Sequence, residues 1–235
     1  MTQNQQNQEV SEIFKSDKYI VLKSFLTDPL LTVSYKYALM KKSVGQTKIE
    51  IGSSFLRTPK LYHDLLMETL LEELLPKIEL VTGLKLYPTY TYGRIYKKGD
   101  FLKRHKDRSA CEVSVTLTLG SDGSTKWPIC VNGPKGDSKI YLNPGDALVY
   151  RGCEVEHWRE SFNGEHQVQI FLHYVEQNGP NAEWRFDKRP QLGTNKPVRF
   201  MDVVSYVVSY LVMLCRERVY QVKRLGMSLV FAIKK

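Results

Sequence analysis

The chain has 235 residues, 42% hydrophobic and 25% charged, as is typical of a globular protein with one sizeable core. Of its net charge of +9, residues 1–193 carry only +3, because eight basic and two acidic residues follow from Thr194 onward. The main part of the chain therefore shows no basic stripe, and we expect no nucleic acid partner. Four cysteines without CxxC spacing argue against a zinc site or a disulfide framework, and the polar start is unlike a secretory signal peptide, so we expect a cytoplasmic protein.

The N-terminal part of the chain is predicted to be mainly helical. Asp28-Pro29 and Thr58-Pro59 each place a capping or turn side chain before a proline, which is typical of a helix start. Leucines then recur at helical spacing until Gly83. The expected elements are, in order, a disordered Gln/Asn-rich segment (1–16), a strand (19–26), a helix (27 to about 42) and a support helix (60–81).

From Leu84 onward the pattern changes to short strands separated by Gly, Asn, Pro and Asp turns. Alternation along the first of them puts Tyr90, Tyr92, Arg94 and Tyr96 on one face. The predicted strands cover residues 87–96, 101–107, 111–119, 127–131, 139–142, 147–150 and 167–175. Strands that follow helices in this way predict an α+β domain over residues 17–193, with antiparallel sheets in a double-stranded β-helix, or jelly roll.

A His-x-Asp pair, His105 and Asp107, lies in one of these strands. Side chains alternate along a strand, so the imidazole and the carboxylate point to the same side and could bind adjacent positions of a metal ion. His157, fifty residues later, is the candidate for a third ligand. Two histidines and one carboxylate form a facial triad that leaves the opposite face of an octahedral iron open.

The order of these features resembles the iron(II)/2-oxoglutarate-dependent dioxygenases, and among them the compact prolyl-hydroxylase-like group. The resemblance covers roughly Tyr87 to Val175. It implies that His105, Asp107 and His157 hold Fe(II), that 2-oxoglutarate is the cosubstrate, and that a C–H bond of the substrate is hydroxylated. Ascorbate is a further candidate cofactor.

The resemblance also implies cosubstrate contacts. Tyr96, nine residues before His105, corresponds to a tyrosine that lines the 2-oxoglutarate pocket, and Thr118 (or Thr116) could bond the distal carboxylate. Tyr92 and His173 are predicted to line the substrate pocket, His173 standing where relatives often have Trp.

In one respect the chain departs from the family pattern. Relatives usually carry Lys or Arg nine to ten residues after the second His, where this chain has His166 and Gln167. A neutral amide brings no charge to the 5-carboxylate of 2-oxoglutarate. Arg159, on the strand face of His157, is our preferred anchor, with Arg94 and a protonated His166 as alternatives.

Other functions stay open on the sequence alone. A cupin-like module that binds a metal or a small ligand without catalysis is favoured by the missing basic residue, and an inactive homologue used for protein contacts is a third reading. The substrate of the enzyme would be a small molecule or a peptide, including a prolyl residue. The basic C-terminal extension, residues 194–235, contains the apolar run 200–215; it is too short to favour a transmembrane helix and is expected to pack or to lie at a membrane interface. The oligomeric state is not predicted.

Overall fold

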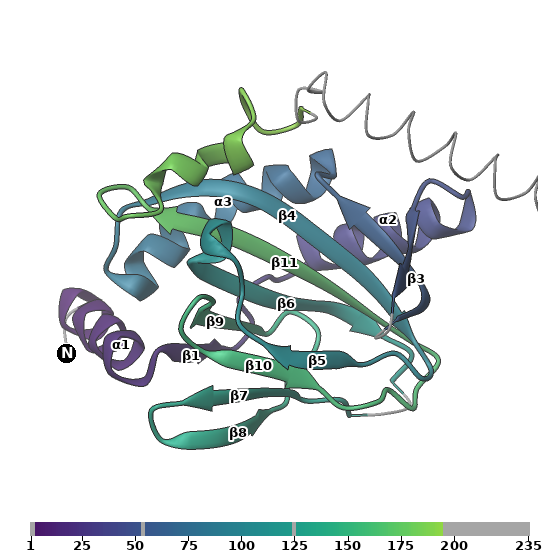
Figure 1. The fold of residues 1–235 in the computed structure, drawn as a ribbon, viewed down its shortest axis with the longest axis horizontal. Helices are drawn as coiled ribbons and strands as arrows, with labels where there is room; N and C mark the ends of the chain where they lie inside the picture. The colour runs from purple at the N-terminus through teal and green to yellow at the C-terminus, as the bar shows by residue number, and fades with distance from the viewer. Residues whose placement is uncertain (1–2, 53–54, 124–125, 195–235) are drawn as a thin grey trace, which may run out of the picture. The chain divides into compact units, whose positions relative to one another are not determined.

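The computed structural model describes residues 3–52, 55–123 and 126–194 (Figure 1). The predicted C-terminal extension therefore lies outside the described residues, apart from Thr194. The helices are α1 (Gln3–Asp17), α2 (Leu30–Ser43) and α3 (Leu65–Thr82), with short 3-10 helices η1 (Ser109–Cys111) and η2 (Ala182–Lys188). The described helices contain no segment that is long and apolar enough to cross a membrane.

Two antiparallel sheets face each other and form the predicted jelly roll. The larger sheet has the order β1-β9-β6-β11-β4-β3-β2 and the smaller one β5-β10-β7-β8. The strands of the larger sheet are β1 (Tyr19–Leu22), β2 (Lys48–Gly52), β3 (Phe55–Tyr62), β4 (Leu86–Lys97), β6 (Val113–Ser121), β9 (Ala147–Arg151) and β11 (His166–Glu176). Those of the smaller sheet are β5 (Leu102–His105), β7 (Ile129–Gly133), β8 (Gly136–Ile140) and β10 (Glu156–Arg159).

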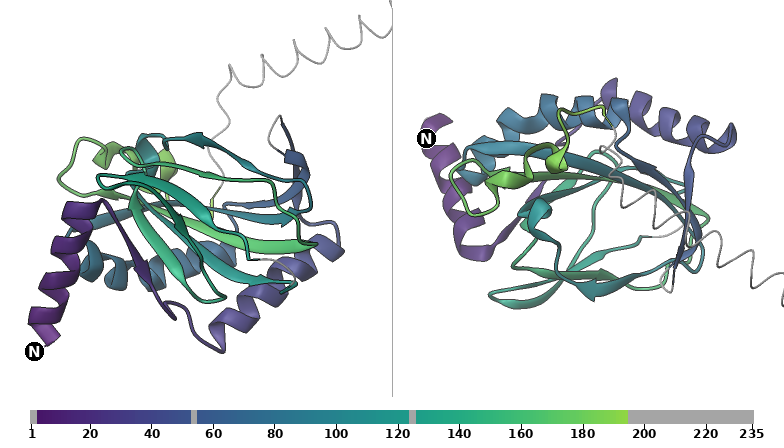
Figure 2. Two further views of the ribbon diagram at one scale, coloured as in Figure 1. Left: turned by 90° about the horizontal axis from the view of Figure 1, so that it is seen from below. Right: turned by 45° about the horizontal axis from the view of Figure 1, so that its top comes forward.

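Apolar and polar side chains alternate along β6, and this alternation explains how the helices and the two sheets are layered. Its apolar residues, among them Val115 and Leu117, belong to the same core cluster as Leu71 and Leu74 of α3. Figures 1 and 2 show α2 and α3 covering the face of the larger sheet that is turned away from β5 and β10. The polar residues of β6 consequently point into the space between the two sheets, which makes that space suitable for a polar site.

The structure differs from the expected order of the N-terminal part at two places. Residues 3–17 form α1 instead of a disordered segment, because Phe14 is completely buried in the main core and holds the polar helix against α3. The Thr58-Pro59 helix start is wrong: both residues lie inside β3, and Thr58 donates a buried hydrogen bond to Asp100. The helix begins at Leu65, where the Asp64 carboxylate caps the first turn.

The segment after β11 is tied back to the rest of the domain through two ion pairs, one fully buried and one whose arginine is partly exposed. Arg189 binds Glu68 of α3 at 2.6 Å, and Asp187, which is fully buried, accepts a hydrogen bond from Arg108 at 2.8 Å. Arg108 directly follows the predicted metal ligand Asp107. The segment 182–189 thus holds the loop that carries this ligand, although it is about 80 residues away in sequence.

Candidate metal centre

The pairing of β5 with β10 brings the predicted triad together. His105 and His157 lie directly opposite each other in register, with ring centroids 4.3 Å apart. Asp107 Oδ1 is 3.7 Å from Nε2 of His105 and 3.6 Å from Nε2 of His157. One ligand atom from each of the three residues lies within 4.8 Å of the others. Such a group can hold one metal ion from one side.

Backbone carbonyls fix the tautomers of both histidines. Nδ1 of His105 lies 2.7 Å from the Lys103 carbonyl, and Nδ1 of His157 lies 3.2 Å from the Val155 carbonyl. A carbonyl can only accept, so each Nδ1 carries the proton and each Nε2 offers its lone pair towards the Asp107 carboxylate. Burial also lowers the pKa of His157, which favours the neutral ring that a metal requires.

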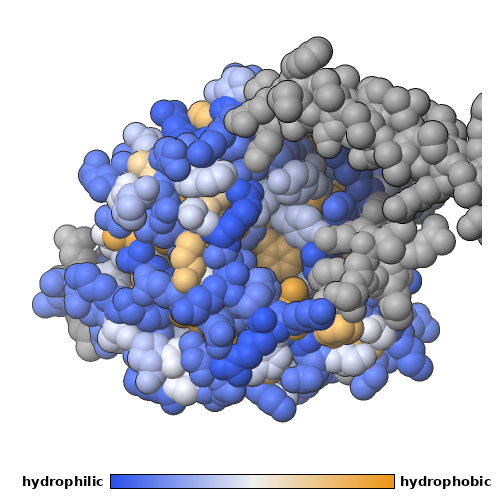
Figure 3. Space-filling view, in the orientation of Figure 1, coloured by the Kyte–Doolittle hydropathy of each residue, from blue (hydrophilic) through white to orange (hydrophobic). Residues whose placement is uncertain are grey.

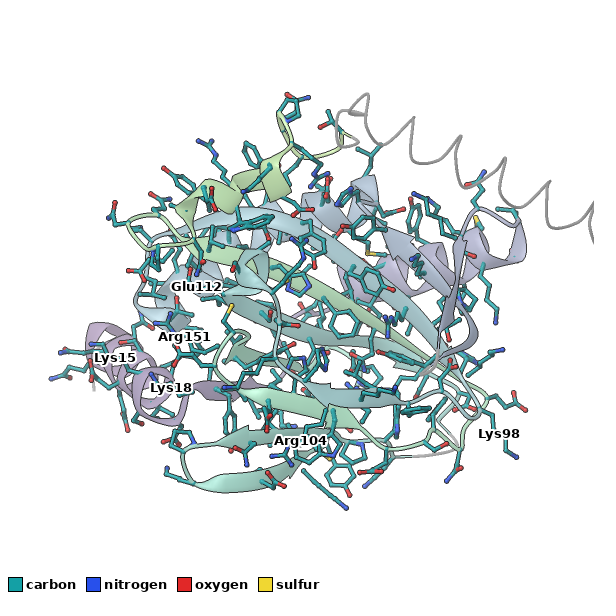
Figure 4. The ribbon with its side chains drawn as sticks, in the orientation of Figure 1. Lys15, Lys18, Lys98, Arg104, Glu112 and Arg151 are labelled. Carbon is teal, nitrogen blue, oxygen red and sulfur yellow. The ribbon has the colours of Figure 1, made fainter. Side chains whose placement is uncertain are left out.

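Asp107 does not lie in a strand as predicted, because β5 ends at His105; it lies in the following loop, which Gly152 and Ser114 hold in place. The Asp107 backbone N–H donates to the Gly152 carbonyl at 2.9 Å, and Ser114 Oγ donates to Asp107 Oδ2 at 2.8 Å. A side chain at Gly152 would meet Asp107 Oδ2 at 2.6 Å and Ser114 Oγ at 2.7 Å, so only glycine fits. The backbone carbonyl of Glu112 accepts from the Gly152 N–H, and its carboxylate pairs with Arg151, which lies beside it in Figure 4.

The open side of the triad faces a cavity of about 210 Å³ between the two sheets. In Figure 3 the middle of this face is hollowed, with apolar surface at the bottom of the recess. The cavity is lined by Tyr90, Tyr92, Arg94, Tyr96, Leu102, His105, Asp107, Tyr150, His157, Phe171 and His173. The four β4 residues that alternation put on one face all line it, and so do both residues predicted for the substrate pocket.

Arg159 lies buried next to this cavity, on the same inward face of β10 as His157. Its Nη1 donates to the Trp127 carbonyl at 3.0 Å, whereas neither its Nε nor its Nη2 has a hydrogen-bond partner within the described residues. Burial lowers the pKa of Arg159 to about 10, so the guanidinium stays charged at neutral pH. The buried phenol of Tyr96 likewise has no partner there. A buried charge is costly without a counter-charge, so this arrangement suits an anionic ligand.

The other predicted cosubstrate residues have different surroundings. Arg94 lines the cavity with its guanidinium above the Tyr92 ring, to whose hydroxyl its Nε donates. Gln167 is buried opposite Tyr96 in the β4–β11 register but does not line the cavity. Thr118 accepts a hydrogen bond from Gln169, and Thr116 donates one to the same amide.

His166, the third candidate for the anchor, lies on the other face of β11. Its Nε2 is 2.7 Å from the hydroxyl of Tyr35, which belongs to α2 on the outer side of the larger sheet. The structure therefore contradicts a role for His166 beside the triad.

The sequence interpretation missed Ser114, Tyr150 and Gly152. Ser114 was predictable, because it lies on the same face of β6 as Thr116 and Thr118, which are candidates on the sequence alone. The role of Gly152 depends on a contact between two loops and has no local signal. Tyr150 was placed in a strand, yet only the register Ser114↔Tyr150 shows that it faces the triad.

The donor set fits an iron(II) site. Two imidazoles and one carboxylate, grouped on one side of an open cavity, are the ligands that non-heme iron uses in oxygenases. The three side chains of the triad would bind a metal ion through nitrogen and oxygen atoms. The cavity leaves space for further metal ligands from solution.

Sequence comparison finds no family model and no curated protein that matches the chain. Solved structures do match. The alpha-ketoglutarate-dependent epimerase SnoN from nogalamycin biosynthesis is 10% identical, with a TM-score of 0.66 over 83% of this chain and 94% of its own. A prolyl-4-hydroxylase from Pseudomonas putida is 15% identical, with a TM-score of 0.60 over 72% and 99%.

A third match is HygX from Streptomyces hygroscopicus, solved with nickel and 2-oxoglutarate, at 15% identity and a TM-score of 0.56 over 76% of this chain and 88% of its own. The chain has the fold of the iron(II)/2-oxoglutarate-dependent oxygenases. The predicted jelly roll is thereby confirmed, and at these identities the likeness is one of fold.

Proposed function

We propose that this chain is an Fe(II)- and 2-oxoglutarate-dependent dioxygenase that hydroxylates a C–H bond of a small molecule or of a peptide, including a prolyl residue. The observation that carries the proposal is the triad itself. Two Nε2 lone pairs and one carboxylate oxygen converge at the wall of a cavity, and backbone carbonyls fix both tautomers. Ligands fixed before the metal arrives are what an iron site requires.

His105, Asp107 and His157 would hold the iron. When bound, iron together with 2-oxoglutarate and dioxygen supplies the oxidising power to attack an unactivated C–H bond, and 2-oxoglutarate leaves as succinate and CO2. The protein fixes the ligands, favours the neutral form of His157 through burial, and surrounds the open side with aromatic side chains that limit access of water.

Arg159 and Tyr96 would bind the 5-carboxylate of 2-oxoglutarate. Both side chains are buried, and both have hydrogen-bonding atoms without a partner in the described part of the chain. A carboxylate placed between them would neutralise the guanidinium and accept from both groups. The family's usual basic position is occupied by Gln167, so the cation would reach the cosubstrate from β10 of the smaller sheet instead.

The substrate would enter through the aromatic side of the cavity, formed by Tyr90, Tyr92 and Phe171. At about 210 Å³ the cavity is smaller than the roughly 300–1,000 Å³ typical of pockets that enclose a drug-sized ligand. We therefore expect it to enclose the cosubstrate and the reacting part of the substrate. SnoN and HygX have been crystallised with nogalamycin RO and hygromycin B, so this fold does accept small molecules.

The test is anaerobic addition of Fe(II) and 2-oxoglutarate to the metal-free protein. A dioxygenase should develop the weak visible charge-transfer band of the iron–2-oxoglutarate chelate, and His105→Ala, Asp107→Ala and His157→Ala should each abolish it while the fold is retained. A non-catalytic cupin-like module, the competing reading, should bind metal without this band. Succinate release across a panel of amino acids, peptides and small metabolites would then identify the substrate class.

A further inference from the structure

Four inward-facing residues form a straight row beneath the triad. Tyr150, Ser114, His173 and Tyr90 lie directly opposite one another across β9, β6, β11 and β4. All four are buried, and all but Ser114 line the cavity. The Asp107 carboxylate contacts this row by accepting a hydrogen bond from Ser114. Directly opposed side chains across antiparallel strands lie close enough to interact, and within this row Ser114 and His173 are joined by a hydrogen bond while the His173 ring lies against that of Tyr90.

The direction of the hydrogen bonds along the row follows from a count of protons. Ser114 Oγ lies 2.8 Å from Asp107 Oδ2, 3.0 Å from His173 Nδ1 and 3.1 Å from the Cys111 carbonyl. A hydroxyl has one proton, and the ionised carboxylate is both the nearest and the strongest acceptor. Ser114 therefore donates to Asp107, and the bond between Ser114 and His173 must be donated by Nδ1–H of the histidine.

We propose that His173 is a positioning residue for Asp107, acting through Ser114, so that the carboxylate offers only Oδ1 to the metal. This inference rests on the proposed function. Oδ1 faces the two histidines, whereas Oδ2 is held by the Ser114 hydroxyl, which His173 orients. A carboxylate released from this bond could turn and bind through both oxygens, occupying a coordination position that cosubstrate or dioxygen needs.

Packing by itself is the competing role for His173. Its ring lies 4.6 Å from the ring of Tyr90, centroid to centroid, and fills space in the floor of the cavity. If packing were its whole role, phenylalanine would replace it. The positioning role instead requires a donor at the place of Nδ1, which an asparagine amide can supply and phenylalanine cannot. These two substitutions separate the two roles.

The experiment measures Co(II) binding to the metal-free protein, by competition with a chelator and by the visible spectrum. Ser114→Ala and His173→Phe should each weaken binding by about 10- to 100-fold and change the Co(II) bands, as loss of a group that orients a metal ligand does. His173→Asn should recover most of the affinity. The double variant Ser114→Ala/His173→Phe should bind no more weakly than Ser114→Ala. Both substitutions break the same chain of hydrogen bonds, which runs from His173 through Ser114 to Asp107.

His166→Phe is the matched control, because His166 lies on the same strand but contacts Tyr35 on the outer face. It should bind Co(II) like the unmodified protein. A nitrogen-15 NMR spectrum of the unmodified, metal-free protein needs no variant and should show the Nδ1–H tautomer at His173.

Three results would overturn the proposal: normal Co(II) binding by His173→Phe, no recovery with His173→Asn, or an Nε2–H tautomer in the NMR spectrum. If the unmodified protein bound no Co(II), the proposed function would fail instead, and the NMR spectrum would still decide whether His173 donates to Ser114.

Discussion

The guanidinium of Arg159 lies against the Trp127 indole, 4.6 Å from its ring centroid, and donates to the carbonyl of the same residue. These two contacts fix the plane of the guanidinium and leave Nε and Nη2 without partners among the described residues. A bidentate carboxylate is the ligand that such a planar pair of donors fits.

Arg159→Met should therefore raise the apparent Michaelis constant for 2-oxoglutarate by tenfold or more, on the order of 1.4 kcal/mol. Methionine keeps most of the packing on Trp127 and removes the charge. Iron affinity should change little, because Arg159 does not touch the triad. The measurement is saturation of succinate release by 2-oxoglutarate, with His166→Ala as the control that should leave it unchanged. Unchanged saturation in Arg159→Met would move the anchor to Arg94.

Gly152→Ala should abolish metal binding although residue 152 is not a ligand. The new methyl group would collide with Asp107 Oδ2, with Ser114 Oγ and with the Cys111 carbonyl, and would displace the carboxylate. Titration calorimetry with Mn(II) measures the loss. Gly93→Ala is a suitable control, since its methyl group would make only ordinary contacts with Leu61 and Gln169. Normal Mn(II) binding by Gly152→Ala would show that the loop can move aside at little cost.

The metal-free protein should lose stability between pH 6.5 and pH 4. Burial lowers the pKa of His173 to about 4, against 6.5 for a free imidazole, so the unfolded chain takes up a proton in this range while the folded chain does not. The contribution of neutral His173 to the free energy of unfolding is fully present above pH 6.5 and is lost as the pH drops. One pKa unit corresponds to about 1.4 kcal/mol, so the total loss is roughly 3 kcal/mol. Urea denaturation across this range should give a steeper decline for the unmodified protein than for His173→Asn. Parallel curves would mean that His173 is protonated in the folded state.

Deletion of residues 195–235 should leave metal binding intact, because the described residues that form the candidate site all lie before residue 174. A chain that ends at residue 180 is the informative contrast. It lacks Asp187 and Arg189 and leaves Glu68 buried without its cation, a change that costs about 3–5 kcal/mol. Binding of Mn(II) and the unfolding midpoint should separate the two forms. A folded 1–194 chain without metal binding would place part of the site in the C-terminal extension.

The sequence predicted the parts of the site that depend on strand alternation. Tyr90, Tyr92, Arg94 and Tyr96 share a face because of the pleat alone, and all four line the cavity. The two jelly-roll sheets followed from the order of the strands, and the match to solved structures confirms them.

What the sequence could not predict depends on tertiary contacts. Thr58-Pro59 has the local signature of a helix start, but pairing of β3 with β2 and β4 decides its conformation. The segment before Asp17 is mostly polar, but its Phe14 is buried in the main core, where α1 packs on α3. Only the register of three strands shows that Ser114 stands between His173 and Tyr150.

The position of β11 in the larger sheet has a consequence for synthesis of the chain. Among the described strands β11 is made last, yet it lies in the middle of its sheet, between β6 and β4. Until residue 176 has left the ribosome, the inner edges of β6 and β4 have no partner, and the nascent chain exposes two open strand edges. We expect the emerging chain to need protection from aggregation up to that point and to close its sheet in one late step.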